Sequence, residues 1–276
     1  MTRILIGVDS SQRSEDAVAF AARLARAGRA ELVVAAVNPE GDEAERLGEP
    51  LGARIVVVEA PSAAHGLHEL AEAEGAALVV VGSTHTGPLG RVRPGSTGER
   101  LLAGAPCAVA VAPHGYRALA DTGFGRIGAA WDGSAESSAA LASAISAARA
   151  FGARLEILTV LSPNVAAMTT PAYVAVLGDV ERDLQGDLDE VVEATSELVR
   201  TEGVLLHGRP WRELAERSAE LDLLFAGSRG YGPGHAVLTG GTSGPLMSHA
   251  HCPTVILPRG ASAPLAEVFE AAWVQG

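Results

Sequence analysis

The sequence predicts an α/β protein made of two similar domains, each with a parallel sheet covered by helices on both faces. Three observations lead to this fold class. Apolar runs alternate with helical segments, each run is nearly continuous, and the whole series occurs twice in the chain. Strands with continuous apolar runs are typical of parallel sheets that are buried on both faces. With 276 residues, the chain is long enough for two domains that each have a core.

The first repeat contains five apolar runs that we interpret as strands. They span residues 3–8, 32–37, 55–58, 78–81 and 108–111. Helices are expected at 14–27, 67–74 and 96–103, the first of them from apolar residues at helical spacing. Only about seventeen residues separate the second strand from the third, and they include Pro39, Gly41, Gly48 and Pro50. We therefore expect a truncated crossover between these two strands.

The second repeat restarts at residue 126, and its first strand ends before Asp132, 123 positions after Asp9. Later strands are expected at 155–161, 204–206, 223–226 and 254–257, and helices at 184–199, 211–220 and 243–249. The offset between the repeats grows from 123 to 145 positions, so the second copy has about 22 additional residues within 162–201. The expected domains are 1–115 and 126–259, with a linker at 116–125 and a tail at 260–276 that includes a short helix at 264–273.

The composition argues against several classes of function. The net charge of −12 and the pI near 5.1 argue against binding to nucleic acid or to an anionic membrane. All 21 basic residues are Arg, so a Walker A lysine, a kinase-type lysine and a pyridoxal Schiff base are impossible. No run approaches the ~18 apolar residues of a membrane span, and Asp9 interrupts the first apolar run. We expect a cytoplasmic protein.

Cysteine and histidine residues indicate neither a disulfide nor a metal site. Cys107 and Cys252 lie 145 positions apart, at equivalent places in the repeats, which favours two core positions over a bridge. His249, His251 and Cys252 are close in sequence, but a further metal ligand at suitable spacing is missing. No sequence motif for a catalytic nucleophile, a catalytic zinc ion or a redox cysteine pair occurs either. Positive evidence for an enzyme is therefore absent.

A glycine-rich loop follows the fourth strand of each repeat and precedes a helix. In the second repeat, two residues separate Gly227 from Gly230 and nine more precede Gly240. Gly82 and Gly95 repeat this frame 145 positions earlier. A strand, a glycine loop and a helix start in this order gather backbone N–H groups around a phosphate. The pattern predicts a nucleotide phosphate site, and a tight turn that binds nothing is the alternative.

Together these motifs resemble the universal stress protein family. Each first strand ends in Asp followed by a Ser-containing turn, as in Val8-Asp9-Ser10-Ser11 and Trp131-Asp132-Gly133-Ser134. The glycine motifs come later in each repeat, and the second repeat closes with the sequence HAHCPTVILP at 249–258. The resemblance covers nearly the whole chain outside the tail. The chain resembles a member of this family that carries two such domains in tandem.

The resemblance implies two Rossmann-like domains, each a five-stranded parallel sheet of order 3-2-1-4-5 with helices on both faces. It also implies that the fifth strands pair in an intrachain pseudo-dimer, and a further homodimer stays open. The ligand would be an adenine nucleotide, ATP in the first place, with Mg, AMP and cAMP left open. Such a protein would act as a stress-response regulator with slow ATP hydrolysis at most. A nucleotide-free interaction scaffold is the alternative function.

In nucleotide-binding members the first-strand Asp lies by the adenine, the end of the second strand contacts the base or ribose, and the glycine motif holds the phosphates. The residues at the corresponding positions of the second repeat are Asp132, Gly133, Ser134, Val160, Gly227, Ser228, Arg229, Gly230, Gly240, Gly241 and Thr242. Those in the first repeat are Asp9, Ser10, Val37, Gly82, Gly95, Ser96 and Thr97. His85 replaces the second glycine of the first motif, and Gly241 replaces a Ser or Thr of the second. The resemblance therefore favours binding mainly in the second repeat.

Overall fold

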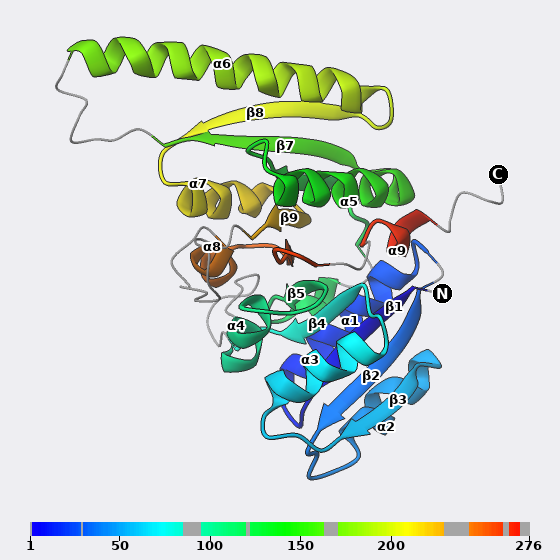
Figure 1. Cartoon of the computed structure of the whole chain (residues 1–276). Helices are drawn as coiled ribbons and strands as arrows, with labels where there is room; N and C mark the ends of the chain where they lie inside the picture. Colours follow the sequence, from blue (N-terminus) through cyan, green and yellow to red (C-terminus); the bar gives the residue numbers. More distant parts are fainter. Residues whose placement is uncertain are drawn as a thin grey trace.

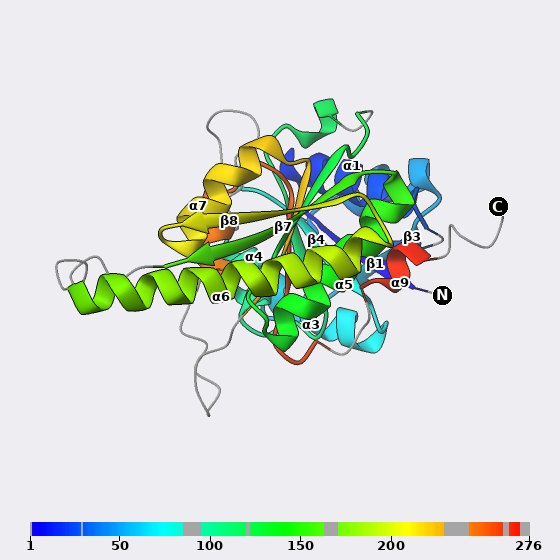
Figure 2. The same ribbon diagram turned by 90° about the horizontal axis from the view of Figure 1, so that it is seen from above.

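Ten strands form one sheet in the computed structural model, with helices on both of its faces (Figure 1). The structure describes residues 2–28, 30–84, 95–119, 122–162, 171–228, 243–261 and 265–270. The strand order is β3-β2-β1-β4-β5-β10-β9-β6-β7-β8. Each half therefore has the order 3-2-1-4-5, which confirms the predicted fold class. Figure 2 shows the twist of the sheet from above.

In the first half, five parallel strands lie between two pairs of helices. The strands are β1 (Arg3–Val8), β2 (Glu31–Val37), β3 (Arg54–Val58), β4 (Leu78–Gly82) and β5 (Ala108–Ala112). The helices α1 (Arg13–Ala25) and α2 (Glu43–Gly48) pack into one core cluster, whereas α3 (Ala63–Ala73) and α4 (Ser96–Leu102) pack into the other. Each core cluster therefore lies on its own face of the sheet.

The second half repeats this arrangement. Its strands are β6 (Arg126–Ala130), β7 (Arg154–Leu161), β8 (Thr201–His207), β9 (Leu223–Gly227) and β10 (Thr254–Leu257). Helices α5 (Ala135–Phe151) and α6 (Pro171–Ser196) cover one face. Helices α7 (Pro210–Arg217) and α8 (Ser243–His249) cover the other.

The crossover before the third strand differs between the halves. In the first half, the six residues of α2 and a 3₁₀ helix at Glu49–Leu51 connect β2 to β3. In the second half, α6 has 26 residues and packs on β7 and β8 through side chains that include Leu188. The N-terminal part of α6 extends beyond the sheet, where Val176 is 57% exposed (Figure 1). In the described part of this longer crossover, the chain therefore forms a long helix at one edge of the sheet.

The halves meet where β5 and β10 pair in antiparallel orientation. Thr254 is opposite Val111, Val255 opposite Ala110, and Ile256 opposite Val109. All of these side chains are buried, and both core clusters contain residues from the two halves. The predicted pairing of the fifth strands within one chain is therefore confirmed.

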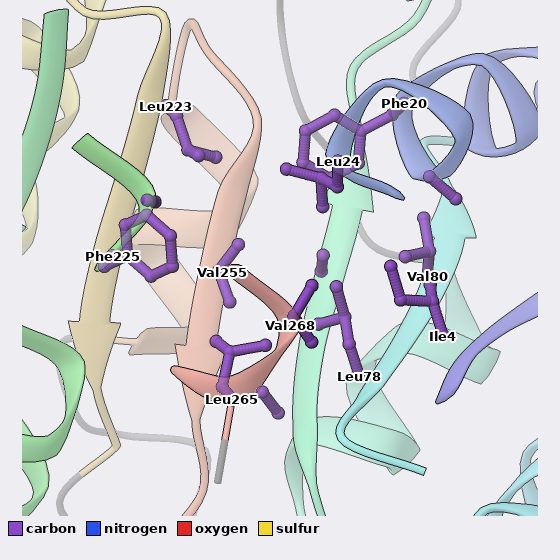
Figure 3. Packing of buried hydrophobic residues seen from close by; sticks show 14 of the residues in the cluster. Ile4, Phe20, Leu24, Leu78, Val80, Leu223, Phe225, Val255, Leu265 and Val268 are labelled. Carbon is purple, nitrogen blue, oxygen red and sulfur yellow. The ribbon is translucent and has the colours of Figure 1, made fainter. Parts of the chain in front are cut away.

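The C-terminal segment completes the core at this junction. Helix α9 (Glu267–Glu270) contacts α1 and α5, and Val268 and Phe269 are fully buried. Figure 3 shows Val268 among the buried side chains of this core. The Phe269 ring lies 6.2 Å from that of Phe151, measured between centroids. A Cβ atom at Gly28 would lie 1.9 Å from the Val268 carbonyl oxygen, so only glycine permits this contact. Residues 265–270 of the segment expected to be a tail thus belong to the core.

The segment expected to be a linker is held against α1. The Asp16 carboxylate accepts hydrogen bonds from the backbone N–H groups of Gly115 (2.8 Å) and Arg117 (3.0 Å). The buried Arg23 guanidinium lies 3.6 Å from the centroid of the Phe124 ring, a cation–π contact. These contacts attach both ends of the connection to the first half.

Both cysteines are buried and unbridged, as their equivalent positions predicted. Burial raises the pKa of the Cys107 thiol to about 12. No helix in the described ranges is long and apolar enough to cross a membrane.

We predict that Phe269→Ala lowers the free energy of unfolding by about 3 to 4 kcal/mol, since it removes a buried ring and leaves a cavity. Denaturant unfolding followed by circular dichroism measures the change. The control is Leu198→Ala, because Leu198 is 52% exposed and its truncation leaves no buried cavity. Equal stability of the Phe269→Ala variant and the parent would contradict the assignment of this segment to the core.

Candidate functional site

Each half has a cavity at the carboxyl ends of its strands, between the first and fourth strands. At this point the connections leave the sheet toward opposite faces, because the second and fourth strands lie on either side of the first. The cavity of the first half has a volume of about 150 Å³. The cavity of the second half has a volume of about 600 Å³. The two repeats therefore provide very different amounts of space at equivalent places.

Four of the predicted second-repeat residues line the larger cavity: Asp132, Ser134, Val160 and Gly227. Gly133 lies in the turn between Asp132 and Ser134 and is not part of the lining. Ser228 adjoins the cavity, since its Oγ lies 3.4 Å from the Oγ of Ser243, a lining residue. The remaining predicted residues lie outside the described part of the chain: Arg229, Gly230, Gly240, Gly241 and Thr242.

The turn after β6 sets the start of α5 at the wall of this cavity. The Asp132 carboxylate accepts a hydrogen bond from the Ser134 N–H (3.1 Å), and Gly133 between them has a φ of 77°. The Ser134 hydroxyl caps α5 by accepting from the Ser137 N–H at 3.2 Å. A residue with positive φ and a polar cap are what a tight strand-to-helix turn requires. The geometry of the turn is therefore sufficient to explain why Asp132, Gly133 and Ser134 occur here, whether or not a ligand also contacts them.

The first glycine of each motif is required by close packing of β4 or β9 against a helix. A Cβ atom at Gly227 would lie 2.6 Å from the carbonyl carbon of Glu136, in the first turn of α5. At Gly82 it would lie 2.2 Å from the carbonyl oxygen of Arg13, in α1. A real Cβ cannot approach backbone atoms so closely. These two glycines are therefore explained by the fold itself.

Residues that the sequence analysis did not select form much of the wall of the larger cavity. Trp211 comes from the first turn of α7, and its ring centroid lies 4.9 Å from that of His249. Leu184 of α6 and Arg209 also line the cavity. Trp131 does so as well, so two of the three tryptophans in the chain lie here. The Pro-Trp pair at a helix start was a usable signal for Trp211, whereas Leu184 depends on how α6 packs.

In the smaller cavity, the predicted Asp9, Val37, Gly82, Gly95, Ser96 and Thr97 all contribute to the lining. Ser10 is exposed and does not. His85, which replaces the second glycine of the first motif, lies outside the described residues.

The Asp9 carboxylate is fully engaged by its own neighbourhood. One oxygen accepts from the Nε (3.0 Å) and Nη2 atoms of Arg13. The other accepts from the backbone N–H of Ser11 (3.0 Å), from the Ser11 hydroxyl and from the Ser14 hydroxyl (3.0 Å). Burial acts to raise the pKa of Asp9, but the hydrogen bonds from Arg13 and Ser11 outweigh it and hold the pKa below its usual value. Asp9 is therefore an ionised group whose acceptors are already used.

This architecture defines a class: tandem doubly wound α/β proteins with a cavity at the switch point of each sheet. The profile of the universal stress protein family matches residues 1–51, 41–113 and 123–258. The chain therefore belongs to the universal stress protein family, and its two repeats make it a tandem member.

Solved structures share this fold across both halves. A universal stress protein from Archaeoglobus fulgidus DSM 4304 is 20% identical, with a TM-score of 0.72 over 94% of this chain and 98% of that one. A functionally unknown protein from Pseudomonas aeruginosa PAO1 is 16% identical, with a TM-score of 0.68 over 99% of this chain and 97% of that one. Comparison with curated protein sequences found no significant match.

We predict that Gly227→Ala destabilises the protein by about 1 to 3 kcal/mol, because the added methyl group forces β9 and α5 apart. Gly186→Ala is the matched control. Gly186 lies on an exposed side of α6, where an added Cβ meets nothing within 4 Å, so this change should stabilise by up to about 1 kcal/mol. Thermal unfolding without any ligand measures both. If both variants unfold like the parent, the packing explanation for Gly227 is wrong.

Proposed function

We propose that the second half of the chain binds ATP or a related adenine nucleotide, and that the protein acts as a stress-response regulator rather than a fast catalyst. The observation that carries this proposal is the cavity of about 600 Å³ beside the start of the second glycine motif. Cavities that enclose small ligands typically measure about 300 to 1,000 Å³. The cavity of about 150 Å³ in the first half falls below this range.

The chemistry of the lining suits a nucleotide. Trp211, Leu214 and Leu246 provide apolar surface of the kind that a purine base packs against. Polar groups lie elsewhere in the lining, among them Asp132, Thr159, Arg209 and Ser243. In a chain with a net charge of −12, Arg209 is a cation placed to offset phosphate charge.

The same lining supports slow chemistry at most. Among the described residues around this cavity, Asp132 is the one carboxylate, and none is His, Cys or Lys. A general base for activating water is therefore not apparent among them. With a single carboxylate and a few neighbouring hydroxyl groups, this lining would hold Mg²⁺ only together with the phosphates of a bound nucleotide.

We predict that calorimetric titration with Mg-ATP detects one nucleotide per chain. Val160→Trp should weaken this binding at least about tenfold, roughly 1.4 kcal/mol, by filling the cavity at the end of β7. Val57→Trp is the matched control, since Val57 is a strand valine that is 53% exposed and outside both cavities. Titrations with GTP, AMP, cAMP and ATP without Mg identify which parts of the ligand are recognised.

The absence of binding by the folded parent chain would overturn this proposal. The paired halves would then be best explained as a nucleotide-free interaction scaffold. Equal weakening by Val160→Trp and Val57→Trp would instead place the nucleotide outside the larger cavity.

A further inference from the structure

Resting on the function proposed for the second cavity, we propose that Arg13, which lines the first cavity and pairs with Asp9 at its opening, keeps nucleotide out of this cavity. The Arg13 side chain would then block access to Asp9 in the first cavity, and the chain would bind one nucleotide rather than two. Arg13 thus acts as a specificity-determining residue.

The contacts of Arg13 support this role. Arg13 and Asp9 both line the first cavity, and the guanidinium donates to one carboxylate oxygen through Nε and Nη2. The other oxygen accepts from Ser11 and Ser14. A base that enters the cavity has to displace the guanidinium and break these bonds before it can reach the carboxylate. The side chains of Arg13 and Asp9 are 39% and 44% exposed, so the pair lies at the opening rather than in the core.

The second half provides an internal comparison, because its framework at this point is the same. Ser137 takes the place of Ser14, with its hydroxyl accepting from the N–H of the first-strand Asp in both halves. Gly227 takes the place of Gly82, each packed against the first turn of a helix. The position of Arg13 is taken by Glu136.

Glu136 cannot form the pair that closes the first cavity. Its carboxylate oxygen lies 3.7 Å from the Nε atom of Arg259, which follows β10. Glu136 does not line the larger cavity, whereas Arg13 lines the smaller one. Two frameworks with matching backbones thus differ in whether the side chain at this position enters the cavity.

The test is the stoichiometry of Mg-ATP binding by calorimetry. The parent chain should bind one nucleotide, and Arg13→Ala should bind two. In the double variant Arg13→Ala/Val160→Trp, the new site should remain, whereas binding to the second cavity should weaken at least about tenfold, so that the two sites separate in affinity. Arg46→Ala is the matched control, since Arg46 is 51% exposed, pairs with Glu15 at 3.7 Å and lines neither cavity.

Arg13→Glu, which copies the second half, provides a second route to the same opening. Thermal unfolding of each variant without nucleotide checks that it is folded. One nucleotide bound by the parent and by both folded Arg13 variants would overturn the inference and leave the proposed function intact. Two nucleotides bound by the parent would overturn it as well. No binding by the parent would overturn the proposed function itself, and a single site that appears only in the Arg13 variants would still support the role of Arg13.

Discussion

The antiparallel pairing of β5 with β10 is the contact on which the rest of the structure depends. It joins two parallel sheets into one and leaves β3 and β8 as the outer strands. An unpaired fifth strand would expose a row of backbone donors and acceptors together with a fully apolar stretch such as Ala108–Ala112. Because each half covers that strand of the other, neither half is complete alone. The tandem chain achieves within one molecule what two separate chains would achieve by association.

Segments outside the repeats reinforce this junction. The C-terminal helix α9 lies between α1 and α5 and brings Phe269 into contact with the rings of Phe151 and Phe225. On the same face of the sheet, Asp16 and Arg23 of α1 attach the connection between the halves through backbone N–H groups and an aromatic ring. Both segments therefore bear on α1, the helix whose first turn also borders the smaller cavity. The packing of the halves and the shape of that cavity involve the same helix.

The two cavities show how far equivalent sites diverge on one framework. The glycines that end β4 and β9 and the serines in the first turns of α1 and α5 make the same contacts in both halves. The differences come from what is added around them. The long helix α6 contributes Leu184 and α7 contributes Trp211 to the lining of the larger cavity. In the smaller cavity, Arg13 instead donates a hydrogen bond to Asp9. The proposed nucleotide site follows from these additions and from the motif together.

The sequence by itself determined the repeats, the strand and helix pattern and the equivalence of the two cysteines, because apolar runs and offsets are local properties of the chain. With the family resemblance it also predicted the strand order and the pairing of the fifth strands. Only the tertiary structure decided that Gly227 is needed by the approach of α5, that Phe269 is a core residue and that Arg13 engages Asp9. Each of these three features depends on contacts between atoms of different structural elements. The volumes of the two cavities also depend on such contacts between elements. The periodicity and spacing of residues in the sequence carry no information about these volumes.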